Sequence, residues 1–258
     1  MKVLFIGDIV GSPGREAVSK LLPDLKKEYE IDITVANAEN LAAGKGFTKE
    51  TLLAMQEAGV EIFTSGNHVW ANKKELELLN DPKFPILRPA NYPSEAPGRG
   101  YLIFNLRAQR LLVINLMGEI DYSYLENPVV CAERILKTEK GKFDFVLIDF
   151  HAEYTSEKAI FSWCLDGKVN AIVGTHTHIP TADAKILPKG TAFITDVGMV
   201  GKKWSSLGVD FEPLVKHYLS GLPAKHQITE EKPLIFNAVL LDLNKNKNQI
   251  QLIQREIN

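Results

Sequence analysis

The residues of this sequence that could do chemistry are polar side chains that directly follow short apolar runs. The runs VLFIG, ITVANA, IFTSG, VLIDF and AIVGT are each followed by an acidic, amide or imidazole side chain. The set comprises Asp8, Glu39, Asn40, Asn67, His68, His151, His176 and His178, and it contains four of the six histidines. Each member alone has a structural explanation, because Asp caps helices, Asn forms turns and a single His often makes structural hydrogen bonds. Capping needs no histidine, so their recurrence at successive strand ends indicates one site.

The mixture of imidazole, carboxylate and amide groups favours divalent metal ions over the thiolate-rich sites of structural zinc. Without His68, the set offers seven potential ligands, more than one tetrahedral ion uses. This predicts two metal ions that share a carboxylate. Such pairs lie about 3.5–4 Å apart, polarise a phosphoryl oxygen and lower the pKa of a bridging water. Two carboxylates against two divalent cations leave a positive centre, so the sequence predicts a site that suits an anionic phosphodiester, with a metal-bridging hydroxide as the nucleophile that attacks phosphorus.

His68 follows Asn67 directly, and adjacent residues beyond a strand end point in different directions. One can bind metal while the other faces the substrate. We therefore expect His68 to protonate the leaving oxygen as a general acid. The alternative is a structural histidine, whose removal would leave turnover almost intact.

The elements that must position these residues are strands alternating with helices. The apolar spacing predicts helices over 12–29, 48–59, 72–81, 127–141 and 155–167. Ser12 is expected to cap the first helix and Pro23 to kink or divide it, whereas Gly59 should end the second. Asn72 and Glu75 have the spacing of a capping box. Strands are expected before each helix, and as two further pairs that turn at 107–110 and at the Asn and Lys cluster near 245.

Length and composition favour one α/β domain over residues 1–258. The chain has 258 residues, of which 45% are hydrophobic, and no repeat or linker-like stretch. Its 30 basic and 32 acidic side chains give a net charge of −2, so we expect no stable complex with nucleic acid. A small phosphorylated substrate remains compatible with this charge, and a homo-oligomer is possible.

The expected location is the cytoplasm, away from membranes. The first apolar run is interrupted at Asp8, too early for a signal peptide, and no run approaches the roughly 18 apolar residues of a membrane span. Cys131 and Cys164 have no CxxC spacing and sit among apolar residues. Both are expected to be buried free thiols rather than a disulfide.

The order of the motifs GD at 7–8, GNH at 66–68, His151 and HTH at 176–178 resembles the calcineurin-like metallophosphoesterase superfamily. The sequence is more specifically similar to the bacterial YmdB-type family of 2′,3′-cyclic-nucleotide 2′-phosphodiesterases. The similar motifs run from residue 4 to about 201, and they are GDIVGSPGR, NAENLAAGKGFT, GNHVW, RPANYP, DFHAEYTSEK, GTHTHIPTAD and TDVGMVG.

The resemblance implies a central β-sandwich of mixed sheets flanked by helices, two iron or manganese ions, and hydrolysis of cyclic nucleotides, 2′,3′-cyclic monophosphates above all. It also implies the ligand pairing. Glu39 would bridge the two ions, and His68 would be the proton donor. The first ion would be bound by Asp8, Asn40 and His178, and the second by Asn67, His151 and His176.

Some residues depart from the superfamily pattern. Val10 stands where the wider superfamily has a histidine, and Glu39 where it has a bridging aspartate, although YmdB-type sequences share both changes. Particular to this chain is GKKWSSLG at 201–208, where relatives tend to carry a proline and an aspartate. Lys202, Lys203 and Trp204 could alter substrate preference, but a solvated loop is the favoured interpretation.

Two further motifs leave alternatives open. Arg88, Asn91 and Tyr92 of RPANYP could hold a phosphate and stack a base, or form a rigid turn. The backbone amides of the Gly44–Gly46 segment could meet an anion, although the spacing excludes a nucleoside triphosphate loop.

Two other functions share part of this pattern. A metal-dependent amidohydrolase barrel also uses an HxH pair, but it carries that pair after its first strand and its aspartate late, the reverse of the order here. A regulatory or scaffold protein with a structural metal site is the other alternative. The seven intact ligand positions argue against a dead site.

Overall fold

Two mixed β-sheets form the centre of the computed structural model, which describes residues 1–120, 122 and 124–258. The first sheet has the order β2-β11-β12-β1-β3-β4, and β13 pairs with β12 in addition. Its strands are β1 (Lys2–Ile6), β2 (Asp8–Ile9), β3 (Ile33–Asn37), β4 (Ile62–Thr64), β11 (Met199–Lys202), β12 (Leu234–Asp242) and β13 (Gln249–Ile257). Strand β1 is parallel to β3 and antiparallel to β12, so this sheet is mixed.

The second sheet has the order β5-β6-β7-β8-β10-β9. Strands β6, β7, β8 and β10 run parallel, and β5 and β9 are antiparallel edge strands. The strands of this sheet are β5 (Tyr101–Leu106), β6 (Gln109–Met117), β7 (Phe145–His151), β8 (Ala171–Thr175), β9 (Lys185–Ile186) and β10 (Ala192–Ile194).

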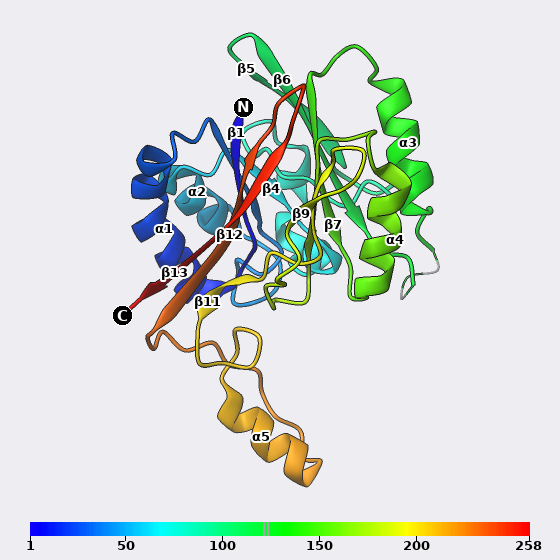
Figure 1. Cartoon of the computed structure of the whole chain (residues 1–258). Coiled ribbons are helices and arrows are strands. Elements are labelled where there is room, and N and C mark those ends of the chain that lie inside the picture. Colours follow the sequence, from blue (N-terminus) through cyan, green and yellow to red (C-terminus); the bar gives the residue numbers. More distant parts are fainter. Residues whose placement is uncertain (121, 123) are drawn as a thin grey trace.

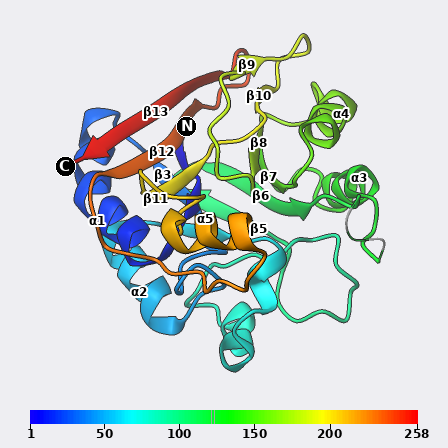
Figure 2. The ribbon, with the colours of Figure 1, turned by 90° about the horizontal axis from the view of Figure 1, so that it is seen from below.

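The two sheets pack face to face, and helices cover their outer faces (Figures 1 and 2). One buried cluster joins alternate residues of both sheets, such as Phe5 and Val35 of the first with Val113 and Leu147 of the second. Two more clusters lie under the helices. The helices are α1 (Gly11–Glu28) and α2 (Lys49–Ala58) on the first sheet, and α3 (Pro128–Thr138) and α4 (Thr155–Leu165) on the second. The expected β-sandwich flanked by helices is confirmed.

The two sheets differ from the open sheets, covered by helices on both faces, for which the strand-end rule is best known. Each sheet has helices on one face and the other sheet on its second face. Burial on both faces explains why the central strands are continuous apolar runs. Such a run shows that both faces of a strand are covered, but it does not show whether helices or a second sheet cover them.

The helix ends agree only in part with the sequence analysis. Gly59 ends α2 in the left-handed conformation, as expected. Helix α1 begins one residue before Ser12, has no side-chain cap, and continues through Pro23 without division. The segment after Asn72 is a 3-10 helix, η2 (Lys73–Asn80), and Asn72 makes no cap hydrogen bond, so the predicted capping box is absent.

Residues 203–233, which we call the arm, leave the first sheet after β11 and return at β12. The arm contains α5 (Phe211–Ser220), which projects from the body of the molecule in Figure 1 and has no buried residue. The sequence analysis did not predict this helix, although Asp210 caps it and Gly221 ends it in the left-handed conformation.

Three smaller expectations can be compared with the structure. Cys131 is buried, but Cys164 is exposed on α4, because it lies on the solvent side of that helix; both are free thiols. Lys202 is not part of a solvated loop, since it belongs to β11 and its side chain is buried. Within the described residues, no helix combines the length and apolar character needed to cross a bilayer.

Candidate metal centre

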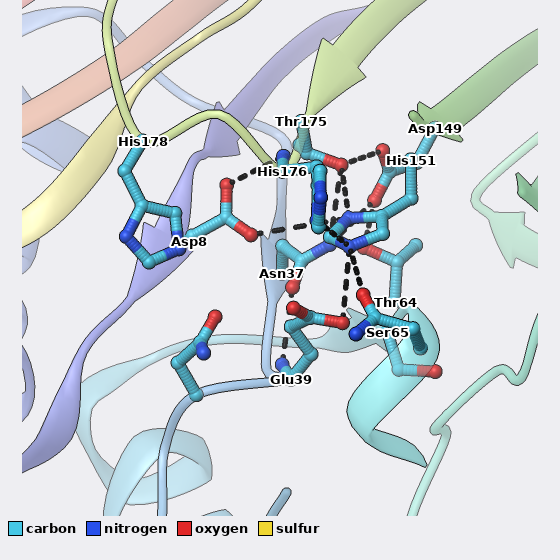
Figure 3. A network of polar contacts seen from close by, with 12 residues as sticks. Asp8, Asn37, Glu39, Thr64, Ser65, Asp149, His151, Thr175, His176 and His178 are labelled. Carbon is cyan, nitrogen blue, oxygen red and sulfur yellow. Dashed lines mark hydrogen bonds and ion pairs between the residues drawn. The ribbon is translucent and has the colours of Figure 1, made fainter. Parts of the chain in front are cut away.

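The site lies where the carboxyl ends of strands from both sheets meet. In the first sheet, Asp8 follows β1, Glu39 and Asn40 follow β3, and Asn67 follows β4. In the second sheet, His151 ends β7 and His176 follows β8. Residues from both sheets face one another at this end of the sandwich (Figure 3). The structure therefore brings the predicted residues together, as the strand-end pattern predicted.

The donor atoms at the centre of the site are separated by about 3 Å. His151 Nε2 lies 3.0 Å from Glu39 Oε2, 2.9 Å from His176 Nδ1 and 3.2 Å from Asn67 Oδ1. Glu39, His151 and His176 form a group able to hold a metal ion among the described residues. Neighbouring ligands of one ion with bonds of about 2.1 Å have separations of this size. The donor set and its spacing therefore fit a divalent metal.

His151 is oriented by a buried network behind it. Its Nδ1 lies 2.9 Å from Thr175 Oγ1, and Thr175 donates a hydrogen bond of 2.7 Å to Asp149. Asn37 and Thr64 also donate to the Asp149 carboxylate. Because Thr175 gives its own proton to Asp149, it accepts one from His151 Nδ1. This leaves the lone pair of neutral His151 on Nε2, facing the other donors.

The two histidines of the HTH motif lie on a strained turn. His176 has a φ of 101° and His178 a φ of 65°, and residues other than glycine rarely adopt such positive values. His176 Nε2 lies 3.1 Å from Glu153 Oε2, and His178 Nδ1 lies 2.9 Å from the carbonyl oxygen of Leu207. These contacts occupy one nitrogen of each ring and leave the other for a ligand role.

A buried ion pair holds this turn through hydrogen bonds to its backbone. Lys158 Nζ lies 2.7 Å from Asp196 Oδ2, and both side chains are fully buried. The same oxygen accepts the backbone N–H of Thr177 at 3.0 Å, between the two histidines. The other oxygen of Asp196 accepts the N–H of Gly198. The pair therefore fixes the turn that carries His176 and His178.

Asp8 and Asn40 each have a buried oxygen atom without a hydrogen-bond partner, although Asp8 Oδ1 lies 3.9 Å from His151 Nδ1. Asp8 Oδ2 accepts the N–H of His176 at 3.2 Å, and Asn40 Nδ2 donates to the carbonyl oxygen of Gly44 at 2.8 Å. Asp8 Oδ1 and Asn40 Oδ1 are buried and make no hydrogen bond. Buried polar atoms are normally paired, so orphaned oxygens here fit ligands of an ion.

His68 lies beside this group but faces outward. Its Nδ1 is 3.3 Å from Glu39 Oε1 and 3.4 Å from Asn40 Nδ2, and its ring is partly exposed. It belongs to η1 (Asn67–Trp70), the 3-10 turn that Asn67 begins. The ring therefore adjoins the metal-ligand set with an edge toward solvent.

The electrostatics of the site's side chains are dominated by burial and by their mutual charges. Burial opposes protonation of His151, but Glu39 and Asp8 outweigh it and raise its pKa to about 9. Burial and the neighbouring His151 charge lower the pKa of His176 to about 3. Burial raises the pKa of Asp8, and it also raises that of Asp149, to about 6. Burial would likewise raise the pKa of Glu39, but His151 and His68 hold it well below its usual range. Such opposed shifts in one cluster are typical of a functional site.

Close packing leaves no room for a side chain at Gly66. A Cβ there would lie 2.1 Å from His151 Cδ2 and 2.2 Å from Glu39 Oε2. The glycine of the GNH motif is therefore required by the approach of the backbone to the ligand cluster.

The sequence analysis missed the residues that support the ligands: Asp149, Glu153, Lys158, Thr175 and Asp196. Two of them had a readable pattern. Asp149 is a charge inside an apolar strand, and Lys158 shares a helix face with Phe161 and Leu165, three and seven residues later. A charge at a core position requires a partner, although sequence does not say which.

In RPANYP and in the Gly44–Gly46 segment, several of the groups considered for ligand binding make hydrogen bonds within the protein instead. Arg88 donates to the carbonyl oxygens of Pro89, Ala96 and Pro97, which favours the rigid turn. Asn91 likewise donates to the carbonyl oxygens of Met117 and Glu126. The amides of Lys45 and Gly46 donate to carbonyl oxygens of their own loop and of Glu39, so they are not available to an anion.

Comparison with known proteins connects this geometry to a family. The model of the YmdB-like protein family matches residues 4–255. A Bacillus subtilis protein named 2′,3′-cyclic-nucleotide 2′-phosphodiesterase is 40% identical over 255 residues, which is 99% of this chain and 96% of the relative. A solved structure of a hypothetical protein from Thermus thermophilus is 39% identical, with a TM-score of 0.93 over 100% of both chains. A phosphatase from Mycoplasma pneumoniae is 33% identical, with a TM-score of 0.92 over 99% of this chain and 93% of that one.

Proposed function

The chain belongs to the YmdB-like family, and on this premise we propose that it is a metal-dependent phosphodiesterase acting on cyclic nucleotides. We take 2′,3′-cyclic mononucleotides as its substrates, because the 40% identical relative is named for them. The observation that carries the proposal is the cluster around His151. Donor atoms of Glu39, Asn67 and His176 lie about 3 Å from His151 Nε2, and His68 lies beside Glu39.

The proposed centre would hold two divalent cations, iron or manganese. Asn67, His151 and His176 would hold one, and Asp8, Asn40 and His178 the other, with Glu39 contributing to both sets. The orphaned oxygens of Asp8 and Asn40 support the second set. When bound, such ions polarise a phosphoryl oxygen and lower the pKa of a water between them.

The chain's own residues supply orientation and a proton. Glu39 and Asn40 contact the Nδ1 edge of His68 and so fix its ring relative to the ligand set. In hydrolysis of a 2′,3′-cyclic ester, water adds to phosphorus and one P–O bond to the ribose breaks. We assign His68 as the group that gives a proton to the departing ribose oxygen.

The test uses metal-depleted protein reloaded with Mn²⁺ or Fe²⁺ and assayed with 2′,3′-cyclic, 3′,5′-cyclic and aryl phosphodiesters. Asn67→Ala is expected to lose bound metal and activity together. His68→Ala is expected to keep its metal content and to lose about 10²- to 10⁴-fold in turnover. The control is His217→Ala, on the exposed helix α5.

The proposal is wrong if the reloaded protein binds two metal ions per chain and cleaves none of these esters, a result that would favour the scaffold alternative. Normal turnover by metal-loaded His68→Ala would contradict the proton-donor role alone. An Asn67→Ala protein with full metal content would contradict the ligand assignment.

A further inference from the structure

The arm closes one side of a cavity that borders the candidate metal centre and is lined by four of its residues: Glu39, Asn40, His176 and His178. The cavity has a volume of about 430 Å³, within the range of small-molecule sites. Residues of the metal centre and His68 form one wall. The opposite wall comes from the arm and includes Leu207, Val209 and Leu214.

The arm is held in this position at several points. The carbonyl oxygen of Leu207 meets His178 Nδ1 at 2.9 Å. On the returning leg, Thr229 and Glu231 both accept hydrogen bonds of 2.6 Å from Lys202 Nζ. Ile228 packs over two glycines of the metal-site loops, since a Cβ on Gly11 or Gly44 would lie 2.8 Å or 3.0 Å from its Cδ1. The apolar wall is thus fixed relative to the ligands.

The chemistry of the two walls differs. The metal-centre wall offers imidazole, amide and carboxylate groups, whereas the arm offers mainly the aliphatic side chains of Leu207, Val209 and Leu214, with Ser206 and His226 beside them. Leu207 remains half exposed, although it lies beside a polar site. An occupant that satisfies both walls has an anionic ester at one end and a flat, weakly polar body at the other.

The chemistry of the leaving group also places the nucleoside on the side of the arm. The leaving oxygen of a 2′,3′-cyclic ester stays attached to the ribose and its base. His68, which protonates that oxygen, lines this cavity. The nucleoside part must therefore lie on the His68 side of the metal centre, where the arm is.

We propose that Leu207, Val209 and Leu214 form the nucleobase subsite, and that the arm thereby makes the enzyme prefer nucleotide esters over esters without a base. This inference rests on the proposed function, whose substrate class it sharpens. Contact of the base with aliphatic side chains gives affinity without selecting one base, so we expect purine and pyrimidine esters to be accepted alike.

The experiment compares two substrates: 2′,3′-cyclic AMP and 1-O-methylribose 2′,3′-cyclic phosphate, in which a methoxy group replaces the base. Leu214→Asp should lower the ratio of their kcat/KM values about 10-fold, because a charge replaces apolar contact with the base. Leu219→Asp is the matched control, since it makes the same change on a strongly exposed position of the same helix. The control should leave the ratio unchanged.

A second measurement does not depend on turnover. Adenosine is titrated into metal-depleted protein and followed by NMR; we expect binding to the parent and to Leu219→Asp, and at least about 10-fold weaker binding to Leu214→Asp. If the parent cleaves neither ester, the proposed function fails while adenosine still tests the subsite. Equal substrate ratios and equal adenosine binding in both variants overturn the subsite. The same equality with a changed oligomeric state would assign α5 to a subunit contact instead.

Discussion

The two walls of the cavity are built in opposite ways. The turn at 176–178 is fixed from within the core, by a fully buried Lys158–Asp196 pair and by hydrogen bonds to its backbone. The arm has a helix with no buried residue, and a few polar and apolar contacts hold it at its base. Ligand geometry has to hold to within about half an ångström, so it is placed on a packed frame. Contact between aliphatic side chains and the flat face of a nucleobase tolerates more movement.

The sharpest test of this contrast breaks the buried Lys158–Asp196 ion pair by replacing its lysine. Lys158→Met leaves the Asp196 carboxylate buried without its cation, and we expect a loss of about 3–5 kcal/mol in the free energy of unfolding. The measurement is urea unfolding of metal-depleted protein. Lys168→Met is the control, because Lys168 pairs with Glu133 on the surface and its loss should cost less than about 1 kcal/mol. Equal losses would show that the turn is not anchored through the core.

The next largest effect is expected behind His151. Thr175→Val keeps the shape of the side chain but removes the acceptor of His151 Nδ1 and a donor to Asp149. We expect metal affinity to fall about 10- to 100-fold, measured by competition with a chelator. Thr138→Val, at the exposed end of α3, should leave the affinity unchanged. Unaltered affinity in Thr175→Val would mean that His151 is oriented by packing alone.

On the arm, the corresponding change should act locally. Lys202→Met removes the hydrogen bonds to Thr229 and Glu231, and Glu231 is largely exposed, so we expect a global loss of about 1 kcal/mol at most. Limited proteolysis should cut within the arm about 5-fold faster, as this energy permits. Cleavage in the sandwich at the same rate as in the arm would contradict a locally held element.

The smallest effect is expected at Trp204, two residues after Lys202 along the chain. Trp204 is exposed, contacts Lys203 through its ring and is not among the residues that line the cavity. Trp204→Ala should change the free energy of unfolding by less than about 0.5 kcal/mol, and kcat/KM for 2′,3′-cyclic AMP by less than about twofold. A larger kinetic change would show that the Trp204 side chain itself reaches the substrate.

The contrast between the packed sandwich and the exposed arm also explains what could be predicted from the sequence. Apolar runs and their polar ends indicated five of the site's strands, because a buried parallel strand must be apolar and its end must be free to carry function. The pairing of those strands into two sheets was not readable, since an apolar run records burial and not the partner that provides it. The resemblance to a family supplied the sandwich.

The supporting residues were harder to infer because their role is set by contacts distant in sequence. Lys158 and Asp196 are 38 residues apart and meet only when α4 packs on the second sheet. The arm was missed for a different reason. Asp210, Pro213 and Gly221 have the spacing of a short helix, but α5 buries no face, so no apolar partner confirmed the pattern that identified the other helices.

Strand β1 has its antiparallel partner in β12, with Lys2 opposite Asp242. During synthesis, β1 therefore leaves the ribosome long before β12 exists, and one edge of an apolar strand stays open for almost the whole of translation. An open apolar edge recruits other strands, which is a route to aggregation. Asp8, a proposed metal ligand, follows that strand after Gly7, so its position too is completed only when β12 has been made. We infer that this chain gains its first sheet, and with it half of the candidate metal centre, after translation of β12 and not progressively from its amino end.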